Sequence, residues 1–212
     1  MLVGYGPLRT PDGLGGAFVR YETFVTATLM AAAVGLGKPY MAVGRSLSYP
    51  TVLLDEVGGF AHQAASLSGD DDLLVQEVAR QNAAPVRFVG DAGSWAWSDA
   101  PQMFGAWLRQ KSRHASAGRH YALGPIVALA LLHGSAAVLW LGAPAWWLWS
   151  GEPGVLGLLA GRVLWQRAVL QDAEEALGAR DLTLTQPVLD LLHTLYQTAL
   201  APLLGLFGGK RW

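Results

Sequence analysis

The sequence predicts an α/β domain followed by transmembrane helices, and three observations lead to this prediction. Apolar residues make up 52% of the 212 residues and charged residues 15%, whereas soluble domains average about 25% charged residues. The charges are uneven, since residues 1–120 hold 20 of the 31 and Glu152 alone lies within 121–161. Strand-like and helix-like patterns alternate within the first part. We therefore expect a water-facing domain over 1–120 and a membrane region over 121–212.

The composition also excludes several classes of protein. The chain has no Cys, so it is neither a disulfide scaffold nor a protein with a cysteine-based zinc or iron–sulfur centre. Its net charge of −1 argues against a nucleic-acid partner, because nucleic-acid binders usually carry a strong basic excess. Its high apolar content distinguishes it from disordered chains.

Within residues 1–60 we expect two strands and two helices. Extended apolar segments predict strands over 2–8 and within 39–49. An almost continuously apolar pattern predicts a buried or membrane-surface helix over 17–34. A short helix is expected over 51–60, closed by the Gly58-Gly59 pair, because Gly suits the left-handed residue after a helix end.

A second set of elements completes the first domain. Ser68 and Asp70 are good N-cap residues, and acidic residues in a first turn suit the helix dipole, so a helix is expected from about 71 to 81. Two strands and a further helix are then expected, in order, at 86–89, 93–98 and 101–118. Alternating strands and helices favour an α/β layered domain, of which 120 residues provide about half a sheet.

The membrane region is expected to cross the bilayer two or three times. Residues 121–161 would extend about 60 Å as a helix, which is roughly two hydrocarbon thicknesses. We predict spans at about 123–141 and 151–170, and an apolar or interfacial helix at 187–207. The loop expected at 142–150 contains three Trp residues, which fits an interfacial aromatic belt.

Charged residues of the membrane region lead to two further expectations. Arg162 lies in the second expected span, where a charge is costly in lipid, so it should face another helix, the interface or a lipid headgroup. The polar stretch 171–181 follows, and Asp172, Glu174 and Glu175 are expected on its solvated face.

The basic residues predict how the chain is oriented. Four of them shortly precede the first expected span, namely Arg109, Lys111, Arg113 and Arg119, whereas 142–150 holds no Lys or Arg. By the positive-inside rule, we expect residues 1–120 to be cytoplasmic and the chain to be a multi-pass protein of the cell's inner membrane.

Three clusters could carry chemistry. In Ser68–Leu73 three adjacent aspartates repel one another, so at least one should have a raised pKa and could act as a general base. Alternatively, they are acids at a helix start. Gln110 and Arg113 share a helix face and could bind a phosphate, or the basic residues there set the topology alone. The third cluster, at 44–49 and 55–60, is also explained by a strand, a turn and a capped helix.

Taken together, four motifs resemble the C-terminal half of membrane-bound family 2 glycosyltransferases, namely GRSLSY, DEVGGF, SGDDDLL and QKSRH. They match, in order, the family's G-x-N-x-x-Y/F strand, its helix ending in GGF, its ED or DD motif and its Q-x-x-R-W motif before membrane helices. The resemblance covers residues 1–120 in detail and the membrane region in layout. It implies a partial A-type, Rossmann-like glycosyltransferase domain and inverting transfer from a nucleotide sugar to a lipid or saccharide acceptor.

The resemblance also implies roles for individual residues. Asp70 aligns with the family's catalytic base, which deprotonates the acceptor hydroxyl, and Asp71 is its close rival. Binding of the acceptor or the leaving diphosphate is implied for six residues: Gly44, Arg45, Asp72, Gln110, Arg113 and His114. Because His114 replaces a Trp that can stack on sugar rings, transfer to a lipid or short acceptor is implied as strongly as processive synthesis.

The family's nucleotide-binding half has no counterpart in this sequence, because no D-x-D motif precedes residue 70. Asp70–Asp72 fits D-x-D in letters, but its position after the GGF element favours the base assignment. We therefore expect Met1 to be an internal point of a longer protein. A divalent metal, Mg²⁺ or Mn²⁺, is then expected to be held mostly by the absent half or by an upstream polypeptide that supplies the donor site.

Two other functions stay open. The absent nucleotide-binding half also fits a non-catalytic membrane subunit or scaffold that complements a separate nucleotide-binding partner. A metal-dependent membrane hydrolase could use the three aspartates, although the His partners usual in such sites are lacking.

Overall fold

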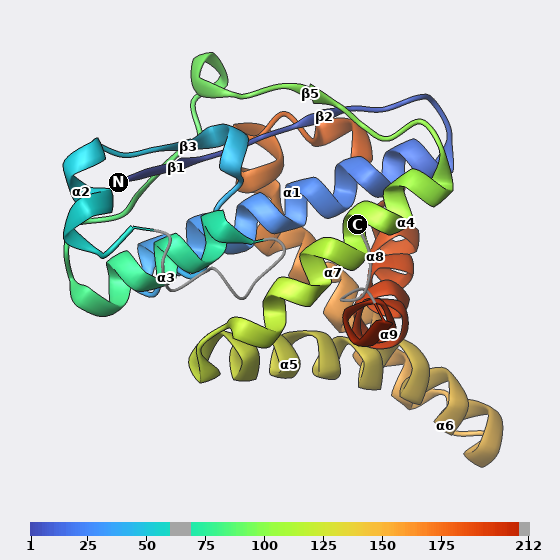
Figure 1. The fold of residues 1–212 in the computed structure, drawn as a ribbon. Coiled ribbons are helices and arrows are strands. Elements are labelled where there is room, and N and C mark those ends of the chain that lie inside the picture. Colours follow the sequence, from blue (N-terminus) through green and yellow to red (C-terminus); the bar gives the residue numbers. More distant parts are fainter. Residues whose placement is uncertain (60–68, 208–212) are drawn as a thin grey trace.

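The computed structural model describes residues 1–59 and 69–207, and helices make up most of this part of the chain (Figure 1). The strands are two or three residues long. β1 (Leu2–Gly4) pairs antiparallel with β3 (Leu47–Ser48) and parallel with β4 (Arg87–Val89). β2 (Leu8–Arg9) pairs parallel with β5 (Ser98–Asp99). Within the described residues, these two small sheets do not build the Rossmann-like layer that the resemblance implies.

The segments predicted as longer strands are interrupted by their own residues. The strand expected over 2–8 divides into β1 and β2 at Pro7, which has no N–H for a sheet ladder. A 3-10 turn, Gly44–Ser46, precedes β3. The strand expected over 93–98 is wrong for most of its length, because a second 3-10 turn, Ala92–Ser94, begins it.

The helices predicted for the first 120 residues are all present. They are α1 (Leu14–Gly35), α2 (Thr51–Glu56), α3 (Asp70–Gln81) and α4 (Phe104–Ala117). Gly58 and Gly59 follow α2 with φ of 82° and 64°, which confirms that left-handed glycines end this helix. The GGF motif is described only up to Gly59, since residue 60 lies outside the described residues.

The loop predicted over 142–150 is wrong, because the chain stays helical there. α5 (Leu123–Ala137), a π turn (Val138–Gly142) and α6 (Ala143–Ser150) form one helix. A proline lacks an N–H and clashes with the carbonyl four residues earlier, and the wider π turn directly before Pro144 relieves this conflict. The resulting 28-residue helix is long and apolar enough to cross a bilayer, and only 11% of its most apolar window is buried.

The second expected span, 151–170, is not supported within the described residues, where 123–150 is the one helix that meets the criterion, whereas the segment expected as an apolar or interfacial helix at 187–207 is helical. α7 (Gly154–Ala176) carries charged residues that pair inside the protein. α8 (Gln186–Leu195) continues through a second π turn (Tyr196–Leu200) into α9 (Ala201–Phe207). The structure therefore offers a single, weak candidate for a membrane crossing.

The region expected to face water, 1–120, and the region expected in the membrane, from 121 on, share a hydrophobic core. α1 crosses the middle of the molecule beneath the strands, and α5 lies along the opposite edge (Figure 1). Tyr21 and Phe24 of α1 are almost fully buried in one cluster with Leu189 of α8. α4 packs along α9. This packing carries the end of α4 past the start of α3, where the predicted site residues lie.

Candidate active site at the start of helix α3

A glycine sets the start of α3 against the end of α4. Asp70 is the first helical residue rather than the N-cap, so that prediction is wrong; the N-cap is Gly69, and Ser68 lies outside the described residues. Gly69 has φ of 80°, a left-handed conformation that suits glycine. A Cβ at this position would overlap the Cβ of Ala117 in α4. The two helices therefore approach as closely as their backbones allow.

Two of the three aspartates bind the segment that follows α1. The Asp72 Oδ1 accepts a hydrogen bond from the Ala42 N–H at 3.0 Å, and the Asp71 Oδ2 accepts one from the Gly44 N–H at 2.8 Å. The Asp71 Oδ1 also accepts the Asp72 N–H at 3.0 Å. Gly44, a predicted site residue, thus reaches the carboxylates through its backbone. Asp70 is exposed at the first turn.

A tyrosine that sequence reasoning missed joins the carboxylates to the start of the membrane helix candidate. The Tyr121 hydroxyl donates a hydrogen bond to the Asp72 Oδ2, and its ring contacts that of Tyr40 at 6.2 Å between centroids. Gln76 accepts the Ala122 N–H at 2.8 Å and donates to the Tyr40 carbonyl at 3.0 Å. No motif identifies Tyr121; its position directly before the apolar segment is the one signal.

These surroundings change the proton affinity of Asp72. Burial is the main cause that raises the pKa of its carboxyl to about 7, and the charge of Asp71 adds to the rise. The hydrogen bonds from Tyr121 and Ala42 act in the opposite direction. The expectation that one of the three aspartates has a raised pKa is confirmed for Asp72, with burial rather than mutual repulsion as the larger cause. A carboxylate with this pKa can accept a proton near neutral pH.

The Q-x-x-R-H residues lie in the second half of α4, beside this cluster (Figure 1). Gln110 is half-buried and Arg113 is exposed. Desolvation, followed by the charge of Lys111, lowers the pKa of the His114 imidazole, and the charge of Asp71 acts in the opposite direction. The imidazole and the first turn of α3 are therefore within electrostatic reach of each other.

Arg45, another predicted binding residue, has a structural position. Its Nη2 donates to the Gly6 carbonyl and its Nε donates to the Ala96 carbonyl at 3.2 Å. Desolvation lowers the pKa of the Arg45 guanidinium. Because it binds two backbone carbonyls, it connects the turn before β3 to the segment between β1 and β2 and to the segment before β5.

The described residues do not fit a divalent metal. Within 1–59 and 69–207, no group of three or more His, Asp or Glu side chains is placed to hold a cation. All four carboxylate oxygens of Asp71 and Asp72 accept N–H or O–H hydrogen bonds, which are partners for anionic oxygen rather than a coordination shell. We therefore derive no step through a metal.

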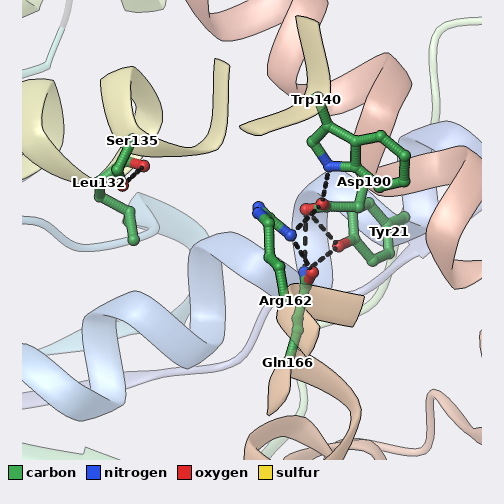
Figure 2. A network of polar contacts seen from close by, with 7 residues as sticks. All are labelled: Tyr21, Leu132, Ser135, Trp140, Arg162, Gln166 and Asp190. Carbon is green, nitrogen blue, oxygen red and sulfur yellow. Dashed lines mark hydrogen bonds and ion pairs between the residues drawn. The ribbon is translucent and has the colours of Figure 1, made fainter. Parts of the chain in front are cut away.

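A second polar centre lies among the helices and was not predicted as a unit. Figure 2 shows four side chains pointing toward Asp190 of α8. Its Oδ2 binds the Trp140 Nε1 at 2.6 Å and the Arg162 Nη1 at 2.7 Å. Its Oδ1 accepts from Gln166 at 2.9 Å and from the Tyr21 hydroxyl at 3.3 Å. The expectation that Arg162 faces another helix is confirmed.

An ion pair within α7 corrects a prediction about the polar stretch. Asp172 and Glu175 are exposed as expected, but Glu174 is only 3% exposed. Its carboxylate pairs with Arg167 at 2.9 Å and accepts the Thr183 hydroxyl at 2.7 Å. A buried carboxylate is tolerable when it is paired and hydrogen-bonded, and these partners lie on other turns that the local sequence does not reveal.

Comparison of the chain with known protein families, with curated proteins and with solved structures gives no match.

Proposed function

We propose that this chain is the acceptor side of a membrane-associated glycosyltransferase that transfers a sugar, with inversion, from a nucleotide sugar to a lipid or saccharide hydroxyl. One observation carries the proposal. The aspartates that open α3 lie beside the end of α4 that carries Q-x-x-R-H, and α4 precedes the one helix of the described residues that could enter a bilayer. The aspartate motif thereby lies next to GRSLSY, through the bond from the Gly44 N–H to Asp71, and next to the helix of QKSRH, through the contact of Gly69 with Ala117.

The proposed reaction needs one base and one cation. A carboxylate takes the proton of the acceptor hydroxyl while that oxygen attacks the anomeric carbon. The bond from this carbon to the diphosphate breaks, and its electron pair leaves with the diphosphate. We assign the base to Asp70, with Asp71 as its rival, because Asp70 is exposed at the first turn of α3, where an acceptor hydroxyl can approach it. Arg113 would stabilise the leaving negative charge.

The remaining residues of the cluster have supporting roles in this proposal. Asp72, Tyr121 and the Gly44 N–H fix the first turn of α3, and Gln110 and His114 extend the same face toward the acceptor. The nucleotide sugar and its divalent metal remain proposed partners, for which the described residues provide no metal site. The basic residues before 123–150 support a cytoplasmic position of the cluster at the inner membrane.

The proposal is tested by sugar transfer in membranes that contain the chain. Membranes that contain the chain together with the polypeptide that supplies the donor site, given radiolabelled UDP- and GDP-sugars, should place label in the lipid or saccharide fraction. Asp70→Asn should reduce the transfer about 100-fold or more, because a general base contributes about 10²–10⁴-fold. Asp91→Asn, at an exposed acid outside the cluster, is the matched control and should leave it unchanged.

Two outcomes would contradict this assignment. Full transfer by Asp70→Asn and by Asp71→Asn would remove both carboxylates from the base role. Absence of any transfer that depends on the chain would favour the non-catalytic membrane subunit instead.

A further inference from the structure

An apolar cavity of about 630 Å³ lies at the other end of α4 from the aspartates. It is enclosed by the starts of α1 and α4, the segments before them, and the α8–α9 helix. Its size is within the range of small-molecule sites. None of the described residues that line it belongs to the candidate active site, so this inference does not depend on the proposed function.

The walls of the cavity are aromatic and aliphatic. Trp107 contacts Phe104 at 5.7 Å, Tyr196 at 5.6 Å and Phe18 at 6.1 Å between ring centroids, and all four rings line the space. At its edge, Leu14 and Phe104 are 57% and 71% exposed. An apolar lining that continues into exposed apolar side chains fits a hydrocarbon chain that enters from a lipid phase.

Two buried polar atoms of this lining lack partners. Trp107 is only 7% exposed, yet within the described residues its Nε1 has no hydrogen-bond partner, and the same holds for the Thr10 Oγ1. Buried donors are normally satisfied, but neighbouring protein atoms cover both groups, so a bound oxygen acceptor would reach them only where the wall shifts around it. The uncapped N-terminus of α1, at Gly13, opens beside them and provides further N–H donors.

The charges of the lining select the kind of headgroup. Among the described residues that form it, Asp12 is the one charged side chain and there is no Lys or Arg. Lys111 lies over the Trp107 ring but is paired with Glu22, so a phosphate would meet a carboxylate and no unpaired cation in the lining, whereas a hydroxyl can donate to Asp12 or to Gln102. We propose that this cavity binds the acyl chain and glycerol ester of a neutral, hydroxyl-bearing lipid such as diacylglycerol.

Photolabelling of the purified full chain in detergent micelles tests this site. The probe is a dioleoylglycerol analogue with a diazirine in one acyl chain, and labelled residues are located by mass spectrometry. Labels are expected within 14–19, 100–107 and 192–200. Unlabelled dioleoylglycerol should compete at several-fold lower concentration than phosphatidic acid with the same chains, and a soluble methyl glucoside should not compete.

Two variants and one control sharpen the test. Gly15→Phe places a ring in open space at the cavity, since a Cβ there meets nothing within 4 Å, and should abolish labelling. Trp107→Phe keeps the ring wall but removes the Nε1 donor, and should weaken binding about two- to tenfold. Gly35→Phe, at the exposed far end of the same helix with equally open space, should bind like the original chain.

The proposal is overturned by any of three results. Labels spread evenly over the exposed face of 123–150 would indicate general micelle contact. Unchanged labelling of Gly15→Phe would place the lipid elsewhere. Competition by methyl glucoside but not by dioleoylglycerol would assign the aromatic walls to a sugar.

Discussion

The two carboxylate centres of this protein differ in the partners that they have. Asp190 is enclosed by side chains from three other helical segments, and one of them is the cation Arg162 at 2.7 Å. Asp71 and Asp72 are held by backbone N–H groups and a tyrosine hydroxyl. A carboxylate that is paired with a guanidinium stays ionised and stabilises the contact between its helices. A carboxyl with neutral donors, and a pKa of about 7 for Asp72, keeps the ability to exchange a proton.

The largest predicted effect concerns the paired centre. Asp190→Ala leaves Arg162 buried without its carboxylate, since the two side chains are 7% and 17% exposed. We expect the free energy of unfolding to fall by about 3–5 kcal/mol, measured by denaturant melts of the purified chain in detergent.

A double variant sharpens this prediction. Asp190→Leu with Arg162→Met removes both charges and should recover part of the loss, because apolar replacement of a buried pair is often neutral. A loss below about 1 kcal/mol for Asp190→Ala would mean that water reaches this centre.

The next effect concerns the contact that holds the aspartates against α4. Gly69→Ala meets both a left-handed φ of 80° and the Cβ of Ala117, so the free energy of unfolding should fall by about 2–4 kcal/mol. Gly59→Ala is the matched control, because it has φ of 64° and open space and should cost about 1–2 kcal/mol. Equal losses for the two variants would show that α3 and α4 do not press together at this point.

The smallest effect is a dependence on pH that comes from Asp72. Its carboxyl has a pKa near 3.8 when unperturbed and about 7 in the fold, so the folded state holds the proton more tightly. The free energy of unfolding should therefore fall as the pH rises from about 4 to about 7, by about 1–2 kcal/mol for this half-buried group. Melts of Asp72→Asn across this interval should lose that slope, whereas Asp91→Asn should keep it.

Tyr121→Phe provides a second check on the same carboxyl. The Tyr121 hydroxyl lowers the pKa of Asp72, so its removal should move the end of the slope to higher pH. If Asp72→Asn, Tyr121→Phe and the control Asp91→Asn all show the same slope of stability against pH, the pH dependence comes from other groups.

The helices were predictable because their signals are local. The apolar run in α1, the acids that open α3 and the Gly58-Gly59 pair that ends α2 each act within a few neighbouring residues. Within the described residues, strands lie in the segments 2–8, 39–49 and 86–89 as predicted, but they are shorter than expected and 93–98 is mostly not a strand, because a strand is stabilised by its neighbours and each strand here pairs over only two or three residues.

The candidate site was predictable in its residues but not in its contacts. The sequence identifies the three aspartates as a unit, and it places Gln110 and Arg113 on one helix face. It does not reveal Tyr121 as a partner of Asp72, or Arg162 as the partner of Asp190, because these pairs lie 49 and 28 positions apart along the chain and meet only after helices pack. The expectation that Glu174 is solvated is wrong for a different reason, because its carboxylate pairs with Arg167 of the same helix and accepts the Thr183 hydroxyl from beyond the helix end.

The length of the 123–150 helix has a consequence for the depth of the aspartates. Its 28 residues extend about 42 Å, some 12 Å more than a typical hydrocarbon core of about 30 Å. In a bilayer this surplus is taken up by tilt or by a first turn that stands among the headgroups. Since Tyr121 directly precedes the helix and holds Asp72, bilayer thickness would set how far the carboxylates stand above the acyl chains.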